Sequence, residues 1–248
     1  MIAESIRQSD VKTYTTTKWA SKVFLYMFMA IGITALVCTV IGLIFTQFFP
    51  IVYGNEVNLD AAKAYIGLFI AAFIMYIPLI LWIHFSVFKE KSRPMIPFVL
   101  YAIVMGVFIS GFTMFVPFYL IAISFGLTCF TFGIMFVIGW FTKRDLSILG
   151  MIGFGMMIGI LFIGLFNVIW MLFFPGFEMI YWVISYGMFA AMLLITIFDI
   201  NRVKRIADSG EQSNKTAVLC AFNLYVDFIY IFIRILSIVV RIYGRSRS

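Results

Sequence analysis

A single aspartate interrupts an otherwise apolar stretch near the end of the sequence. Asp227 lies within 216–240, a run long enough to form a membrane-spanning helix. Counted from Thr216, its carboxylate would be roughly 16 Å along that helix, near the middle of a hydrocarbon core about 30 Å thick. An aspartate at that depth costs about 2.5–3.5 kcal/mol on insertion scales. Because intramembrane acids usually mark a proton or ion path, Asp227 is the first candidate functional residue.

Other polar groups share a face of this predicted helix. Asn223, Asp227, Tyr230 and Arg234 follow one another at intervals of three or four residues. A polar stripe on a membrane helix is expected to face the helix bundle or a water-filled cavity. Arg234 lies two turns, roughly 10 Å, beyond Asp227, so we expect a water molecule or another helix between their charges.

A second acid, Asp199, ends the preceding apolar run. Asp199 and Asp227 are each 14 residues from Ser213, near the tip of the polar stretch 208–215. In a symmetric antiparallel hairpin such residues lie at similar depth, so the two carboxylates can face each other. Neighbouring carboxylates do not both ionise readily and share one proton, which would make the pair a pH sensor without histidine. Their oxygens also suit a hard cation, although two carboxylates fall short of the six to eight oxygens that calcium takes.

A purely structural explanation of these acids stays open. Asp199 would then cap a helix end near water, and Asp227 would pair with Arg234 to fix the fold. His84, the only histidine in the sequence, lies near the end of another predicted span. It is a possible site residue, but an interfacial or merely hydrogen-bonded histidine is the preferred interpretation. The three cysteines lie in apolar runs without ligand-like spacing and are predicted to be packing residues.

The composition requires a membrane protein. Hydrophobic residues make up 64% of the 248 residues and charged residues only 12%, whereas about a quarter of a soluble domain is charged. Mean hydropathy is +1.09. The net charge is +7, and the basic residues lie in short loops between apolar runs. That placement indicates membrane orientation and not nucleic-acid binding.

Seven spans fit the apolar runs, and together they predict a single all-α polytopic domain. A polar arm covers 1–22. The spans are about 23–49, 64–88, 95–116, 118–141, 148–174, 179–201 and 216–240. Two double-length runs are divided at Pro117 and near Pro175. In the fifth span, crowded glycines predict close helix contact or a bend: Gly153, Gly155, Gly159 and Gly164.

Basic residues predict the orientation. Lys and Arg number 4, 1, 3, 0, 2, 0 and 4 in the N-terminal arm and the six successive loops. By the positive-inside rule this alternation places the N-terminus in the cytoplasm. Seven crossings then place the basic tail after 240 outside, against the rule. We prefer seven full crossings to a last segment that does not fully cross. In a bacterium the membrane would be the plasma membrane.

Three motifs resemble the transmembrane Bax inhibitor motif family. They are Lys-Arg-Asp-Leu-Ser-Ile-Leu-Gly at 143–150, Phe-Asp-Ile at 198–200 with the basic cluster after it, and Asn-Leu-Tyr-Val-Asp-Phe-Ile at 223–229. The resemblance is specific over about 141–234; the N-terminal half matches only in span count and hydropathy. It implies a seventh helix wrapped by the other six and a pH-sensitive calcium leak. The two aspartates that share a proton and gate the path would be Asp199 and Asp227.

The sequence departs from that family pattern in two ways. Members with this gate often carry an arginine in the second span that latches the aspartates, but 64–88 contains none. The latch would then be missing, moved to Arg234 or replaced near His84. The segment between the two aspartates is also a few residues longer than expected.

Two functions from different classes follow. The preferred one is a passive, proton-modulated cation leak in the lipid bilayer, with calcium as the transported or transiently bound ion and no resident cofactor. The alternative is a non-transporting membrane regulatory or interaction protein in which the aspartates are structural; its protein partners are not predicted. An enzyme is disfavoured. The sequence lacks the Gly-x-Gly-Asp of intramembrane aspartyl proteases and the Gly-x-Ser-Gly of rhomboid-like proteases, and 216–240 lacks a retinal-binding lysine.

Overall fold

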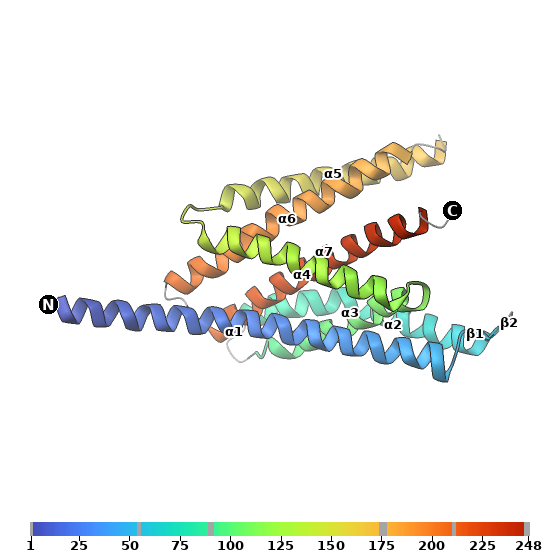
Figure 1. Cartoon of the computed structure of the whole chain (residues 1–248), viewed down its shortest axis with the longest axis horizontal. Helices are drawn as coiled ribbons and strands as arrows, with labels where there is room; N and C mark the ends of the chain where they lie inside the picture. The colour runs from blue at the N-terminus through green and yellow to red at the C-terminus, as the bar shows by residue number, and fades with distance from the viewer. Residues whose placement is uncertain (1, 54–55, 89–91, 174–177, 210–211, 246–248) are drawn as a thin grey trace. The chain divides into compact units, whose positions relative to one another are not determined.

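The computed structural model describes residues 2–53, 56–88, 92–173, 178–209 and 212–245. Its elements are α1 (Ile2–Leu43), a π-helical turn η1 (Ile44–Phe48), β1 (Val52–Tyr53), β2 (Glu56–Val57), α2 (Leu59–Phe88), α3 (Met95–Phe115), α4 (Phe118–Phe141), α5 (Ser147–Phe173), α6 (Glu178–Ser209) and α7 (Asn214–Arg245) (Figure 1). Seven helices among these residues are long and apolar enough to cross a membrane. The predicted all-α membrane fold is confirmed. The short antiparallel pair β1–β2 is the one addition to it.

Helix boundaries follow the predicted spans closely. The break at Pro117 is confirmed, because Val116 adopts an extended conformation with φ −114° and ψ 125°. A proline disfavours helical geometry in the residue before it, so α3 ends there and α4 can begin at Phe118. The break near Pro175 lies outside the described residues. The arm 1–22 forms the start of α1 from Ile2, and α6 extends past the predicted end at 201 to Ser209.

The chain forms two compact units, and α7 contributes to both. Unit 1 contains Met1–Ile123 and Ser209–Tyr225; unit 2 contains Ser124–Asp208 and Val226–Ser248.

In unit 1 the first half of α7 packs against α1, α2 and α3. The Phe222 ring contacts Phe98 and Tyr101 of α3, with centroid distances of 5.9 and 5.0 Å. Thr34 of α1 donates a hydrogen bond of 2.9 Å to the Ala102 carbonyl. Its oxygen lies 2.6 Å from the Tyr225 hydroxyl. Because Thr34 has a single hydroxyl hydrogen, Tyr225 is the donor in that second bond.

In unit 2 three glycines let α4 and α5 approach the backbone of α6. A Cβ added to Gly139 of α4 would lie 2.7 Å from the Ile197 carbonyl oxygen. A Cβ on Gly150 or Gly153 of α5 would lie 2.6 Å from Phe198 or 2.8 Å from Ile195. Figure 1 shows α5 running beside α6. The segment 195–200 of α6 is therefore packed against α4 and against α5.

Of the four glycines in the fifth span, one makes the predicted close contact and three do not. Gly153 makes the close helix contact that the sequence suggested, but Gly155, Gly159 and Gly164 have nothing within 4 Å of an added Cβ. Gly155 and Gly159 are exposed, whereas Gly164 lies on the same face of α5 as Gly153 but has nothing within 4 Å of an added Cβ. Sequence spacing alone does not tell which side of a glycine-rich helix meets a neighbour.

The seventh helix is the most covered of the seven. In its apolar window 67% of residues are buried, against 44% or less in each of the other spans. In unit 2 the Phe228 ring of α7 contacts Phe125 and Phe132 of α4, at centroid distances of 5.8 and 5.6 Å. In unit 1 the first part of α7 contacts α1, α2 and α3, and in unit 2 its second part contacts α4 and α6.

Candidate functional site

The two predicted acids lie together in unit 2, on α6 and α7. Asp199 is 8% exposed and Asp227 is 3% exposed. The carboxylate of Asp227 lies within electrostatic range of Asp199. Residues 28 positions apart in sequence therefore reach one buried site through the α6–α7 hairpin. The sequence argument anticipated this juxtaposition, and the role of the pair stays a prediction.

Asp227 carries an unsatisfied oxygen. Among the described residues its Oδ2 is the one fully buried side-chain nitrogen or oxygen without a hydrogen-bond partner. Buried polar atoms are nearly always paired, and an unpaired carboxylate oxygen is especially costly. An oxygen in this setting is suited to hold a proton or to contact a cation. It is the strongest chemical signal in the structure.

A buried hydroxyl that the sequence reasoning missed completes this group. Thr196 of α6 is fully buried, one turn before Asp199. Its hydroxyl donates to the Met192 carbonyl at 2.8 Å and also lies within hydrogen-bond reach of Asp227. One hydroxyl hydrogen serves a single acceptor at a time, so Thr196 can donate to either. In the sequence, Thr196 could have been found from its position three residues before Asp199, because this spacing puts both side chains on one face of a helix.

Arg234 does not act as the counter-ion of Asp227. Its guanidinium donates to Ser185 of α6 at 3.0 Å and to the Tyr230 hydroxyl at 3.2 Å, and lies 3.6 Å from the Met188 sulfur. Within the described residues neither of the two ion pairs involves Arg234. Arg234 lies two turns from Asp227, and its guanidinium contacts side chains of α6 instead. Tyr230 thus belongs with Arg234 at one end of the predicted stripe.

The positive charge that acts on Asp199 comes from Arg202. It lies three residues after Asp199 on α6 and is exposed, and its charge interacts with the Asp199 carboxylate. Helix α2 contains no arginine. Arg202 belongs to the basic cluster that follows Phe-Asp-Ile at 198–200, and its action on Asp199 was not predicted.

The remaining candidates lie in unit 1. The His84 Nδ1 is 2.8 Å from the Ile80 carbonyl oxygen of its own helix, and its exposed ring meets Phe222 edge-on at 5.9 Å. These contacts fit the interfacial, hydrogen-bonded histidine preferred above. Asn223 is half-buried on α7.

The acidic pair lacks the ligands of a resident metal site. No group of three or more His, Cys, Asp or Glu residues is arranged to hold a metal ion in the part of the chain that the structure describes. Asp199 and Asp227 supply four carboxylate oxygens at most, fewer than calcium normally takes. Any cation at this pair would keep several water ligands and bind weakly.

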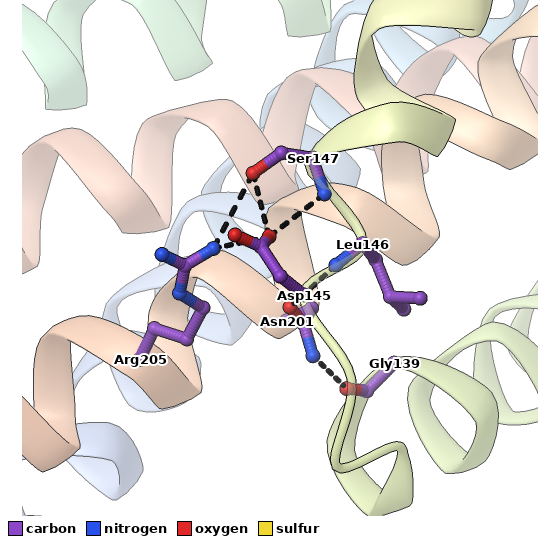
Figure 2. A network of polar contacts seen from close by, with 6 residues as sticks. All are labelled: Gly139, Asp145, Leu146, Ser147, Asn201 and Arg205. Carbon is purple, nitrogen blue, oxygen red and sulfur yellow. Dashed lines mark hydrogen bonds and ion pairs between the residues drawn. The ribbon is translucent and has the colours of Figure 1, made fainter.

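A polar network ties α6 to the connection between α4 and α5, just beyond Asp199 (Figure 2). The Asn201 amide donates to the Gly139 carbonyl at 3.1 Å and accepts from the Leu146 N–H at 3.4 Å. Lys204 donates to two carbonyls at the end of α4, at 2.7 and 3.3 Å. Cations near a helix C-terminus are favoured by its dipole.

The outer part of this network involves the motif at 143–150. Asp145 accepts from the Ser147 N–H at 2.9 Å and from its hydroxyl at 2.6 Å, and pairs with Arg205. These bonds from Ser147, together with the Arg205 charge, hold the pKa of Asp145 below its ordinary value. The motif thus acts as an anchor for the start of α5.

Comparison with known proteins agrees with this architecture. The family model for the inhibitor of apoptosis-promoting Bax1 matches residues 16–245. The inner membrane protein YbhL of Escherichia coli K12 is 32% identical over 155 residues, which cover 60% of this chain and 62% of YbhL. An uncharacterized membrane protein of Streptococcus pyogenes serotype M3 is 35% identical over 114 residues, 45% of this chain and 46% of that protein. These matches thus span less than two thirds of either relative. The family match covers nearly the whole chain, which therefore belongs to the Bax inhibitor family of multi-pass membrane proteins.

Proposed function

We propose that this protein is a passive, proton-modulated cation leak, with calcium as the transported ion. Family membership supports the general class of membrane protein, and the specific activity is inferred from the acidic pair. Asp199 and Asp227 would line the path and share a proton that controls it. No enzymatic step is proposed.

The observation that carries this proposal is the buried, unpartnered Oδ2 of Asp227. A carboxylate kept only to stabilise the fold would be expected to have its oxygens satisfied, because an unpaired one is costly. Placed beside Asp199, the same oxygen can bind a proton at one pH and a cation at another. Intramembrane acids with no fixed counter-ion typically serve proton or ion movement.

The weakness of the cation site favours a leak over a storage site. Conduction requires an ion to enter and also to leave, so tight chelation would oppose it. Two carboxylates without a third acidic, histidine or cysteine ligand meet that condition. Burial of the pair limits access by water and is suited to a low resting flux.

We further propose that the N-terminus is cytoplasmic and that the membrane is a bacterial plasma membrane. The alternation of Lys and Arg between loops supports the orientation. YbhL, the E. coli relative, is an inner membrane protein. In this orientation Asp199 is in the cytoplasmic half of α6.

The test is calcium flux into dye-loaded proteoliposomes across a pH series. We expect Asp199→Asn and Asp227→Asn each to abolish most of the pH response between about pH 6 and about pH 8, where a proton-sharing carboxylate pair can titrate. Asp208→Asn is the matched control, since it removes an exposed acid from the same helix as Asp199. It should leave the response unchanged.

Two outcomes contradict the proposal. A wild-type pH response in both Asn variants would show that this pair does not control the leak. Calcium entry no faster than into empty liposomes, with correctly folded protein, would instead support the non-transporting regulatory role. In that case the Asn variants should lose expression or stability and no flux would change.

A further inference from the structure

Asn201 is buried immediately beyond the acidic pair and uses both ends of its amide. It lies two residues after Asp199 on α6 and is 3% exposed. Its Nδ2 donates to the Gly139 carbonyl at 3.1 Å, and its Oδ1 accepts from the Leu146 N–H at 3.4 Å (Figure 2). A buried amide is tolerated when donor and acceptor are both satisfied, as they are here.

These two bonds connect three elements. Gly139 lies in the last turn of α4, whose final carbonyls have no partner within the helix. Leu146 is the residue before α5 begins at Ser147. A single side chain of α6 therefore satisfies the end of one helix and the entry to the next.

Close packing acts at the same place. The missing Cβ of Gly139 would meet the Ile197 carbonyl oxygen at 2.7 Å and Ile200 at 3.0 Å. Contacts with α4 thus occur on both sides of Asp199 in sequence, at 197 and at 200–201. The turn of α6 that carries this carboxylate is fixed to α4, whereas Asp227 belongs to another helix.

We propose that Asn201 is a positioning residue for Asp199: its two hydrogen bonds hold the Asp199 turn against α4 and the α5 entry, and so set the pH at which the leak responds. This inference rests on the proposed function. The charged groups that act on Asp199 are Asp227 of α7 and Arg202 of α6. Asn201 is neutral and acts only through the distance between the carboxylates.

The experiment replaces Asn201 and measures calcium flux in proteoliposomes as a function of pH. Asn201→Leu keeps the number and branching of the side-chain heavy atoms but makes neither hydrogen bond. Freed from α4, Asp199 should move away from Asp227, and the weaker repulsion should shift the midpoint of the response to lower pH by about half a unit or more. Asn201→Ser retains one short polar group and should give a smaller shift in the same direction. It also provides the test if the Leu variant does not fold.

Thr34→Val is the matched control, because it removes a buried side-chain tether between helices in unit 1. It should lower thermal stability to a similar extent and leave the pH midpoint in place. An unchanged midpoint in folded Asn201→Leu or Asn201→Ser, with Asp199→Asn still altering the response, would overturn the positioning role alone. Wild-type responses in Asp199→Asn and Asp227→Asn would overturn the proposed function itself.

Discussion

At the scale of single residues, the chemistry concentrates in three side chains: Asp199, Asp227 and Thr196. All three are buried, and Asp227 retains an oxygen without a partner. The Thr196 hydroxyl can donate to ionised Asp227, or accept from protonated Asp227 while donating to the Met192 carbonyl. The hydroxyl could therefore adapt to both protonation states without any movement of the helices.

Thr196→Val tests this adaptation. Valine has nearly the same shape but offers no hydrogen bond, so both protonation states of Asp227 lose a partner. The ionised carboxylate loses the stronger, charge-assisted bond, and the protonated form is therefore favoured. We expect the midpoint of the pH-dependent calcium flux to move to higher pH, by about three quarters of a unit for a net loss of about 1 kcal/mol. Thr196→Ser should restore the wild-type midpoint. If valine and serine give equal midpoints, Thr196 only packs and bonds its own helix.

At the scale of elements, the positions of the acids depend on how closely α4 and α5 pack against α6. Gly139→Ala should force α4 away from α6, because its Cβ would meet a backbone carbonyl that has no side-chain freedom to move. We expect the melting temperature in detergent to fall, corresponding to about 1–3 kcal/mol. Gly133→Ala, also in α4, has nothing within 4 Å of the added Cβ and should be neutral or slightly stabilising. Equal melting temperatures for the two variants would show that the helices are not in close contact at Gly139.

The elements themselves could largely be predicted from the sequence, because membrane thickness and proline geometry fix where apolar helices begin and end. The prediction of α4 over 118–141 needed only an apolar run and Pro117. The proximity of Asp199 and Asp227 followed from hairpin arithmetic. The side of each helix that contacts a neighbour could not be predicted from the sequence. Gly155 and Gly159 were therefore expected in contacts, and Arg202 and Thr196 were not recognised beside the acids.

At the scale of the whole molecule, the direction of crossing decides which protons the acidic pair would respond to. From Asp199 to the end of α6 at Ser209 is 10 residues, about 15 Å of helix. That end is predicted to be cytoplasmic because the α6–α7 connection is rich in Lys and Arg. The pair should then sense cytoplasmic pH, and the proposed leak would be modulated from inside.

Cysteine labelling tests this orientation and the full crossing of α7. In a variant whose native cysteines are replaced by serine, we would introduce Lys63→Cys, Asp208→Cys or Gly244→Cys, all at exposed positions. With seven crossings and a cytoplasmic N-terminus, a membrane-impermeant maleimide should label the cysteines at 63 and 244 in intact cells. The cysteine at 208 should react only after permeabilisation. Protection at 244 together with labelling at 63 would mean that α7 does not cross, despite an apolar window more buried than that of any other helix. Labelling at 208 in intact cells would reverse the orientation and place Asp199 toward external protons, so the flux response would have to be driven by the outside pH.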